Sequence, residues 1–221
     1  KNPIFAVPQT DPFGLIGTDC EFVDIDSDGD FDAFADFMFY KNIGTAVNPN
    51  LAPPVKDTSG LGFSKPRFVD IDNDGDFDAF VGSGDFFGGG DLEFFRNIGS
   101  KIKPIFHRDG SKPFGLGAPG SYHKPSFADI DNDADIDVFI SNNNGDTYFF
   151  KNMGSGNNPS FASSSSFGMD NVEFFSNSTF ADIDGDGDLD GFVGIGFSYD
   201  ETTKGQTLFF DLSHQTRCSY K

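Results

Sequence analysis

The sequence predicts an all-β fold built from four repeats, and three observations support this prediction. Short apolar segments alternate with turn residues, and the chain shows no helical periodicity. One acidic motif recurs four times, with spacings of 46, 59 and 53 residues between its copies. The 221-residue chain also holds 30 phenylalanines, whose large apolar rings require a buried core and argue against disorder.

Each repeat reads as a series of short strands around the acidic motif. An aromatic-led segment enters the motif, a short apolar run leaves it, and a second aromatic segment follows. In three repeats this last segment ends in Asn-x-Gly, which predicts a hairpin turn because both residues tolerate positive φ. The three turns are Asn42–Gly44, Asn97–Gly99 and Asn152–Gly154. A further short segment follows an Asn-Pro or Lys-Pro pair, as in Lys103–Phe106 and Asn158–Phe161.

The length and content of the repeat favour one architecture. Four short antiparallel strands in a repeat of about 50 residues are typical of a β-propeller blade. We therefore expect one β-propeller domain over residues 1–221, with four blades of four antiparallel strands. The repeats span approximately residues 16–61, 62–117, 118–171 and 172–221.

The N-terminal segment matches the end of a repeat. Residues 3–15 resemble residues 104–116 at a constant offset of 101 positions, and the last repeat shows no clear fourth strand. We expect residues 1–15, as closing strand and linker, to complete the last blade and close the ring, which removes two sheet edges. Two alternatives remain open. The chain is a piece of a larger ring, or this strand completes a blade of a neighbouring molecule and builds a polymer.

The negative charge of the chain is concentrated in the acidic motifs. The net charge is −20, from 35 acidic and 15 basic residues, and 20 of the acids lie in the four motifs. The rest of the chain therefore has 15 acids against 15 bases and is formally neutral. With no basic excess we expect no binding of nucleic acid, and no apolar run approaches the ~20 residues that membrane insertion requires.

Each motif has the form D-x-D-x-D-G/A-D-x-D and is expected to hold one cation. Side chains at positions 1, 3, 5 and 9, with the carbonyl at position 7, offer hard oxygen ligands. This set favours Ca²⁺, with Mg²⁺ second, and no cysteine or histidine lies near enough to suggest zinc or copper. We expect about four Ca²⁺ ions per chain. The candidate metal residues are Asp24, Asp26, Asp28, Asp30, Asp32, Asp70, Asp72, Asp74, Asp76, Asp78, Asp129, Asp131, Asp133, Asp135, Asp137, Asp182, Asp184, Asp186, Asp188 and Asp190.

Two further positions of the motif define the loop. Position 6 is glycine in three copies, Gly29, Gly75 and Gly187, which suits a left-handed residue, but it is Ala134 in the third copy. We expect that third loop to bind more weakly or to turn slightly differently. An EF-hand is rejected because position 12, where its bidentate glutamate would stand, is apolar in every copy. These residues are Ala35, Val81, Ile140 and Val193.

Taken together, the motifs resemble a known repeat. The Phe-x-Asp-x-Asp entry, the DxDxDGxxD loop, the exit into a Phe-Val-Gly strand and the Asn-x-Gly turn are similar to the FG-GAP/VCBS repeat of integrin-α-type β-propellers. The resemblance implies Ca²⁺ in the loop between the first two strands of each blade. Rings in that family usually have about seven blades, whereas this chain has four repeats. The family occurs in extracellular adhesion proteins, lectins and polysaccharide-associated enzymes, so the resemblance implies an extracellular, secreted protein.

The two cysteines and three histidines lie outside the acidic motifs. Cys20 precedes the first strand of the first repeat and Cys218 follows the third strand of the last, so ring closure would bring them together. We expect a disulfide between them in an extracellular protein, the alternative being two unpaired buried thiols. The histidines His107, His123 and His214 occupy non-equivalent loops and form no catalytic cluster.

The predicted function is that of a secreted, calcium-stabilised, non-catalytic adhesion, scaffold or assembly module. Its partner would be a protein or glycan ligand at the cell surface or matrix, or another copy of the chain. One alternative is a lectin-like propeller that binds carbohydrate through exposed aromatic faces. Tryptophan is absent, so the candidates are Tyr40, Tyr122, Tyr148 and Tyr199. Another alternative is the protomer of an extracellular filament joined by donation of the N-terminal strand.

Overall fold

The computed structural model describes residues 13–16, 19–35, 38–56, 61, 65–82, 90–166, 177–194 and 207–210. In these residues fifteen strands form four antiparallel sheets, three of four strands and one of three. A single 3-10 turn, η1 (Pro113–Gly115), is the only helical element of the described part. None of the described segments forms a helix with the length and apolar character to cross a membrane. The predicted all-β class is confirmed.

Within each sheet the strands pair in chain order. The first sheet contains β1 (Cys20–Val23), β2 (Asp32–Ala35), β3 (Met38–Tyr40) and β4 (Val55–Lys56). The second contains β5 (Pro66–Val69), β6 (Asp78–Gly82), β7 (Leu92–Asn97) and β8 (Phe106–Ser111). The third contains β9 (Lys124–Ala128), β10 (Asp137–Ser141), β11 (Thr147–Phe150) and β12 (Ser165–Ser166). The fourth contains β13 (Asn177–Ala181), β14 (Asp190–Gly194) and β15 (Thr207–Phe210).

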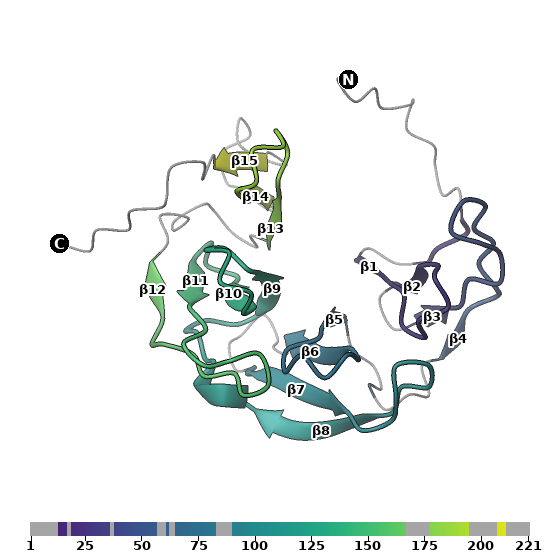
Figure 1. The fold of residues 1–221 in the computed structure, drawn as a ribbon, viewed down its shortest axis with the longest axis horizontal. Coiled ribbons are helices and arrows are strands. Elements are labelled where there is room, and N and C mark those ends of the chain that lie inside the picture. The colour runs from purple at the N-terminus through teal and green to yellow at the C-terminus, as the bar shows by residue number, and fades with distance from the viewer. Residues whose placement is uncertain are drawn as a thin grey trace.

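The four sheets follow one another around an arc (Figure 1). The first strand of each sheet lies toward the inside of the arc and the last strand toward the outside. Neighbouring sheets contact each other through their inner strands: β1 meets β5, β5 meets β9, and β9 meets β13. The first and fourth sheets form the two ends of the arc.

An aromatic core fills the space between neighbouring sheets. A phenylalanine in the second strand of one sheet packs against a phenylalanine in the first strand of the next. The three contacts, measured between ring centroids, are Phe34–Phe68 at 4.7 Å, Phe80–Phe127 at 5.1 Å and Phe139–Phe180 at 4.3 Å. The phenylalanines at these strand positions therefore form the core that their number predicted.

The second strand of a sheet is buried on both of its faces. In β2 the side chain of Phe34 joins the core shared with the second sheet, while Ala33 and Ala35 pack with Tyr40 in a separate cluster. Successive side chains of a strand point to opposite faces, so a strand between two cores must be apolar at every position. This explains why the run that leaves each acidic motif is continuously apolar instead of alternating.

The fourth strand of a sheet begins where predicted in the second sheet and later in the third. β8 begins at Phe106, directly after Pro104-Ile105, but Phe161 forms only an isolated bridge with Asn152, and β12 begins at Ser165. Residues 1–12 lie outside the described residues. Completion of the fourth sheet by the N-terminal strand and closure of the ring therefore stay predictions, as does a single domain over residues 1–221.

Replacing Phe80 with alanine should destabilise the protein, because its ring is fully buried between the second and third sheets. We expect the free energy of unfolding to fall by about 3–5 kcal/mol, as is usual for a phenylalanine removed from a packed core. Urea unfolding measures this change. Ile102→Ala, at an exposed turn residue, is the control and should change stability by less than about 0.5 kcal/mol. Equal effects of the two substitutions would contradict an aromatic core between these sheets.

Candidate metal centre

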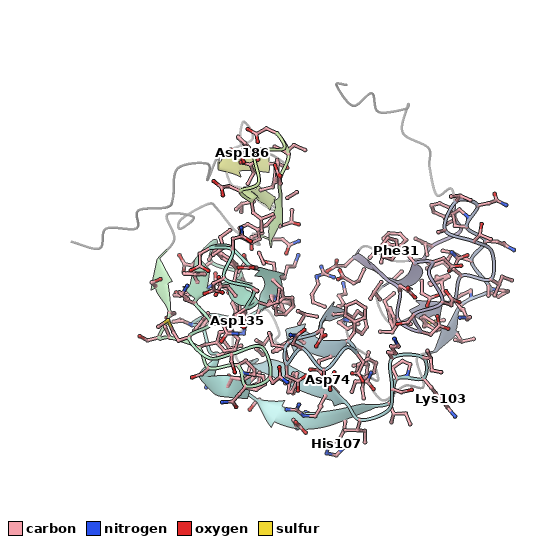
Figure 2. The ribbon with its side chains drawn as sticks, in the orientation of Figure 1. Phe31, Asp74, Lys103, His107, Asp135 and Asp186 are labelled. Carbon is pink, nitrogen blue, oxygen red and sulfur yellow. The ribbon has the colours of Figure 1, made fainter. Side chains whose placement is uncertain are left out.

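Four acidic loops connect the first and second strands of the four sheets. The acidic loops are residues 24–32, 70–78, 129–137 and 182–190, and each lies between the two strands expected from the sequence. In every loop the carboxylates at positions 1, 3 and 5 offer oxygen atoms that lie within 4.8 Å of one another. Each loop can therefore hold a metal ion. Figure 2 shows Asp74, Asp135 and Asp186 in three separate sheets around the arc.

The carboxylate at position 1 organises the backbone of its loop. In the first loop the Asp24 carboxylate accepts hydrogen bonds from the backbone N–H of Asp28 at 3.0 Å and of Gly29 at 3.1 Å. The equivalent Asp70 and Asp129 accept the same two bonds, at 3.1 and 3.0 Å and at 3.0 and 2.9 Å. These bonds close the loop into a tight turn, so the other acidic side chains are held together on a short stretch of backbone.

Two residues in each loop adopt a left-handed backbone. At position 6 the φ angles of the three glycines are 94–96°, as predicted, and Ala134 has φ 71°. Ala134 keeps the hydrogen bond from its N–H to Asp129, so the third loop makes the same turn with a strained residue. Position 4 is also left-handed, which the sequence analysis missed. Its residues are Ser27, Asn73, Asn132 and Gly185, with φ of 53°, 53°, 59° and 81°. The asparagines and the glycine at this position could have indicated it, because these residue types adopt positive φ more readily than others.

The aspartate at position 9 begins the second strand and is buried in every sheet. These residues are Asp32, Asp78, Asp137 and Asp190. In the first three sheets its Oδ1 accepts a hydrogen bond from the backbone N–H of the asparagine that follows the aromatic segment. The distances are 2.6 Å from Asn42 to Asp32, 2.8 Å from Asn97 to Asp78 and 2.7 Å from Asn152 to Asp137. This bond ties the acidic loop to the turn after the third strand.

The second oxygen of this aspartate has no protein partner in the first two sheets. Among the described residues, Oδ2 of Asp32 and Oδ2 of Asp78 are buried without a hydrogen-bond partner. Asp26 and Asp30 in the first loop each have one further oxygen that is buried without a partner. The equivalent residues of the second loop, Asp72 and Asp76, each have one as well. Buried carboxylate oxygens without partners are costly, and a hard cation would satisfy all of them. The residues therefore fit the metal that the motif suggests.

The aspartate at position 7 also places an oxygen in the loop, in agreement with its inclusion among the candidate metal residues. In the first two loops Asp30 and Asp76 each have a buried, unpartnered carboxylate oxygen, and the expected role of the backbone carbonyl stays a prediction. Acidic side chains at this position thus belong to the same set of oxygens as those at positions 3 and 9.

Burial also raises the pKa of the position 9 carboxyl in the first three sheets. Loss of solvent raises the pKa of Asp32 to about 6, that of Asp78 to about 7 and that of Asp137 to about 6, although the hydrogen bond from the asparagine N–H acts in the opposite direction. Neighbouring aspartates of the loop add to the rise. Without a cation, these carboxyls therefore hold a proton at a pH where ordinary aspartates are ionised.

A basic side chain that was not among the candidate site residues reaches into three of the loops. Lys41 Nζ contacts Asp26 and lies 3.2 Å from Asp28, and Lys151 Nζ makes the equivalent contacts with Asp131 and Asp133. In the second loop Arg96 Nη1 lies 2.6 Å from Asp72. The sequence could have indicated this contact, because a basic residue directly precedes the asparagine in three repeats. The corresponding residue of the fourth repeat is Asp211, which lies outside the described residues.

The Asn-x-Gly turns exist, but the predicted reason for them is wrong. Gly44, Gly99 and Gly154 are not among the described residues with positive φ. Glycine is required instead by close approach: a Cβ on Gly99 would lie 2.4 Å from the backbone oxygen of Lys103, and the other two glycines are equally crowded. The asparagine contributes its side chain, since Asn97 Oδ1 accepts hydrogen bonds from the N–H of Gly99 at 3.0 Å and of Ile105 at 3.1 Å.

The remaining candidate residues do not form a second site in the described part of the chain. Tyr40 is buried and its hydroxyl accepts a hydrogen bond from the Ile16 N–H, so its expected role as an exposed aromatic face is wrong. Tyr122 and Tyr148 are half-buried, His123 is buried and His107 is exposed on β8. Cys20 lies exposed on β1. Tyr199, His214 and Cys218 lie outside the described residues, so the disulfide stays a prediction.

Comparison with known families decides the identity of the repeat. Residues 129–193 match the FG-GAP-like repeat. The matched segment begins at the third acidic loop and ends in β14, so it includes the third and fourth loops and the strand that follows each. The FG-GAP-like repeat expected from the sequence is thereby confirmed over this part of the chain. No curated protein matches the sequence.

Without metal, the protein should become less stable as the pH rises from 5 to 8. The folded-state pKa values of Asp32, Asp78 and Asp137 lie above the ordinary value of 3.8. Their contribution to stability is complete below that value and is lost as the pH rises through about 6–7. In excess chelator we expect the melting temperature to fall by several degrees over this range. Asp78→Asn, which cannot ionise, should reduce the fall. A melting temperature that rises toward pH 8 in chelator would contradict the burial of these carboxyls.

Gly99→Ala should destabilise the second sheet through the crowding of its new methyl group against the Lys103 carbonyl. We expect a loss of about 1–3 kcal/mol, typical of an overpacked site, measured by urea unfolding. Gly194→Ala is the matched control, because its Cβ would meet nothing closer than 3.9 Å. If both glycines tolerate alanine equally, close approach is not the reason for the glycine.

Proposed function

We propose that this chain is a calcium-stabilised β-propeller module of a secreted protein, with a non-catalytic role in adhesion, as a scaffold or in assembly. The observation that carries the proposal is the set of buried carboxylate oxygens without partners in the first two acidic loops. Hydrogen bonds hold these loops in shape, yet the bonds leave the inward oxygens unsatisfied. A bound cation accounts for both features.

The chemistry of the donors favours calcium. All are carboxylate oxygens on one short loop, and Ca²⁺ accepts six to eight oxygen ligands in flexible geometry, whereas Mg²⁺ requires a strict octahedron and retains waters. The aspartates at positions 1, 3, 5, 7 and 9 would hold the ion. The ion would supply positive charge to a group of acids that otherwise repel one another and would secure the connection between the first two strands.

The arrangement of the sheets supports the propeller. The strands of each sheet are paired in chain order, the inner strands of successive sheets are in contact, and the sheets curve around one axis (Figure 1). These are the features of blades around a centre. We propose four blades in this chain, one for each acidic loop.

The module role follows from the repeat and from how its acids are used. FG-GAP-like repeats form β-repeat domains often involved in adhesion or ligand binding, which is the basis for the proposed extracellular location. The motif aspartates, if committed to metal, are not available as an acid and base pair for catalysis. Carbohydrate binding is the second candidate, and it rests on the partial exposure of Tyr122 and Tyr148.

Calcium removal should lower the melting temperature by many degrees, because the acids of the loops would then repel one another. Thermal unfolding in Ca²⁺ and in excess chelator measures the difference, and native mass spectrometry should count about four ions per chain, one for each loop. Asp78→Asn should remove one ion, whereas Asp91→Asn, outside the loops, should remove none. An unchanged transition in chelator would overturn the proposal.

A further inference from the structure

One histidine of the structure is buried without a hydrogen-bond partner. His123 lies directly before β9 and is 5% exposed. Both of its ring nitrogens, Nδ1 and Nε2, are buried and make no hydrogen bond. Burying a polar group in this state costs free energy, so most buried imidazoles pair at least one nitrogen. His123 belongs to no acidic loop, and its burial therefore requires an explanation of its own.

The surroundings of the ring keep it neutral near pH 7. Loss of solvent lowers the pKa of His123 below its ordinary value of 6.5, although nearby backbone carbonyls and the Asp91 carboxylate act in the opposite direction. Two cations weaken the influence of that carboxylate. They are Lys112, whose Nζ lies 3.3 Å from Asp91 Oδ1, and Lys124, the next residue in the chain. The nearby carbonyls belong to Pro119, Ala118 and Gly90.

His123 ends a strained segment that connects the second sheet to the third. This connecting segment, residues 118–123, lies between η1 and β9. Two of its residues have a left-handed backbone, Gly120 with φ 96° and Tyr122 with φ 54°. Glycine adopts this conformation readily, whereas a tyrosine is strained in it and must be held there by its surroundings.

Contacts with both sheets hold the connecting segment in place. On the side of the third sheet, the Ser121 N–H donates to Asn143 Oδ1 and the Asn143 N–H donates to the Ser121 carbonyl, each at 3.0 Å. On the side of the second sheet, the backbone of His123 lies directly against Gly82, the last residue of β6. A Cβ on Gly82 would lie 1.4 Å from the His123 carbonyl oxygen. The segment is thus wedged between the two sheets, with the neutral ring buried at its end.

We propose that His123 is an acid-sensitive latch, which keeps the connecting segment closed between the second and third sheets while neutral and opens it when protonated. In the closed position a charged ring would have neither water nor a carboxylate of its own to compensate it. In the open position water solvates the charge. Acid therefore favours the open position, and the strain at Tyr122 is relieved at the same time.

The size and sign of the effect follow from proton linkage. The closed position is fully favoured above pH 6.5, the ordinary pKa of histidine, and loses this advantage as the pH falls. If only the open position takes up the proton, the ratio of open to closed segments rises by up to about thirtyfold between pH 7.5 and pH 5.

The latch is independent of the proposed calcium sites, because its titrating group lies outside the acidic loops. The two also respond to acid in opposite directions. Protonation of the position 9 carboxyls stabilises the metal-free protein, whereas protonation of His123 opens one connection between sheets. Melting temperature reports the sum of both effects, so the latch has to be measured locally, by the exchange of individual backbone amides.

Hydrogen exchange of the 221-residue chain in excess Ca²⁺ tests the latch. After correction for the intrinsic effect of pH, the protection of the Ser121 and Asn143 amides should fall by about ten- to thirtyfold between pH 7.5 and pH 5. His123→Phe keeps a ring but cannot be protonated, so it should abolish the fall. His107→Phe is the matched control, because His107 is exposed on the outer side of the arc (Figure 2), and it should leave the fall unchanged. The amide of Ile98, in a distant turn, should keep its protection.

Two results would overturn the proposal. One is equal protection of Ser121 and Asn143 at both pH values in the unmodified chain. The other is a fall that persists undiminished in a folded His123→Phe variant. If that variant does not fold, titration of the histidine rings of the unmodified chain by nuclear magnetic resonance decides the matter. The His123 ring should titrate at a lower pH than the His107 ring, and the opposite order contradicts the latch.

Discussion

The hydrogen bond from an asparagine N–H to the buried aspartate at position 9 is the constraint on which the rest of each of the first three repeats depends. In the second sheet the bond joins Asn97 to Asp78, at the end of the third strand and the start of the second. The same asparagine holds the next turn through its side chain, while the same aspartate leaves one oxygen for the loop. One buried polar connection thus sets the register of two strands, one turn and one acidic loop.

The acidic loops and the aromatic cores act at different places in the sheet. The loops lie at the ends of strands and concentrate negative charge, whereas phenylalanines fill the space between sheets. The position 9 aspartate is the point where both meet, because it is the first residue of the buried second strand. In the first three sheets its burial raises its pKa, and in the first two it leaves an oxygen without a partner that a cation could satisfy.

Much of this arrangement could be predicted from the sequence, because periodicity and repetition are local properties. The all-β class, the four loops and the left-handed Gly29 follow from residue type and spacing alone. The role of Gly99 could not be predicted, since it depends on the distance to a carbonyl four residues away and not on its own φ. The burial of Tyr40 and the contact of Lys41 with the first acidic loop depend likewise on how the strands pack. The spacing of residues in the sequence does not determine that packing.

The basic residues that contact three of the loops affect how a cation could bind there. Lys41, Arg96 and Lys151 are counter-ions joined to the chain by covalent bonds, so neither dilution nor a chelator can remove them. Binding of a divalent ion to these loops would therefore be an exchange, in which that ion replaces the lysine or arginine side chain as the counter-ion of the aspartates. In the fourth repeat the corresponding residue is Asp211, which adds a negative charge instead. Three loops therefore carry part of their compensating charge within the chain itself, whether or not an ion is bound.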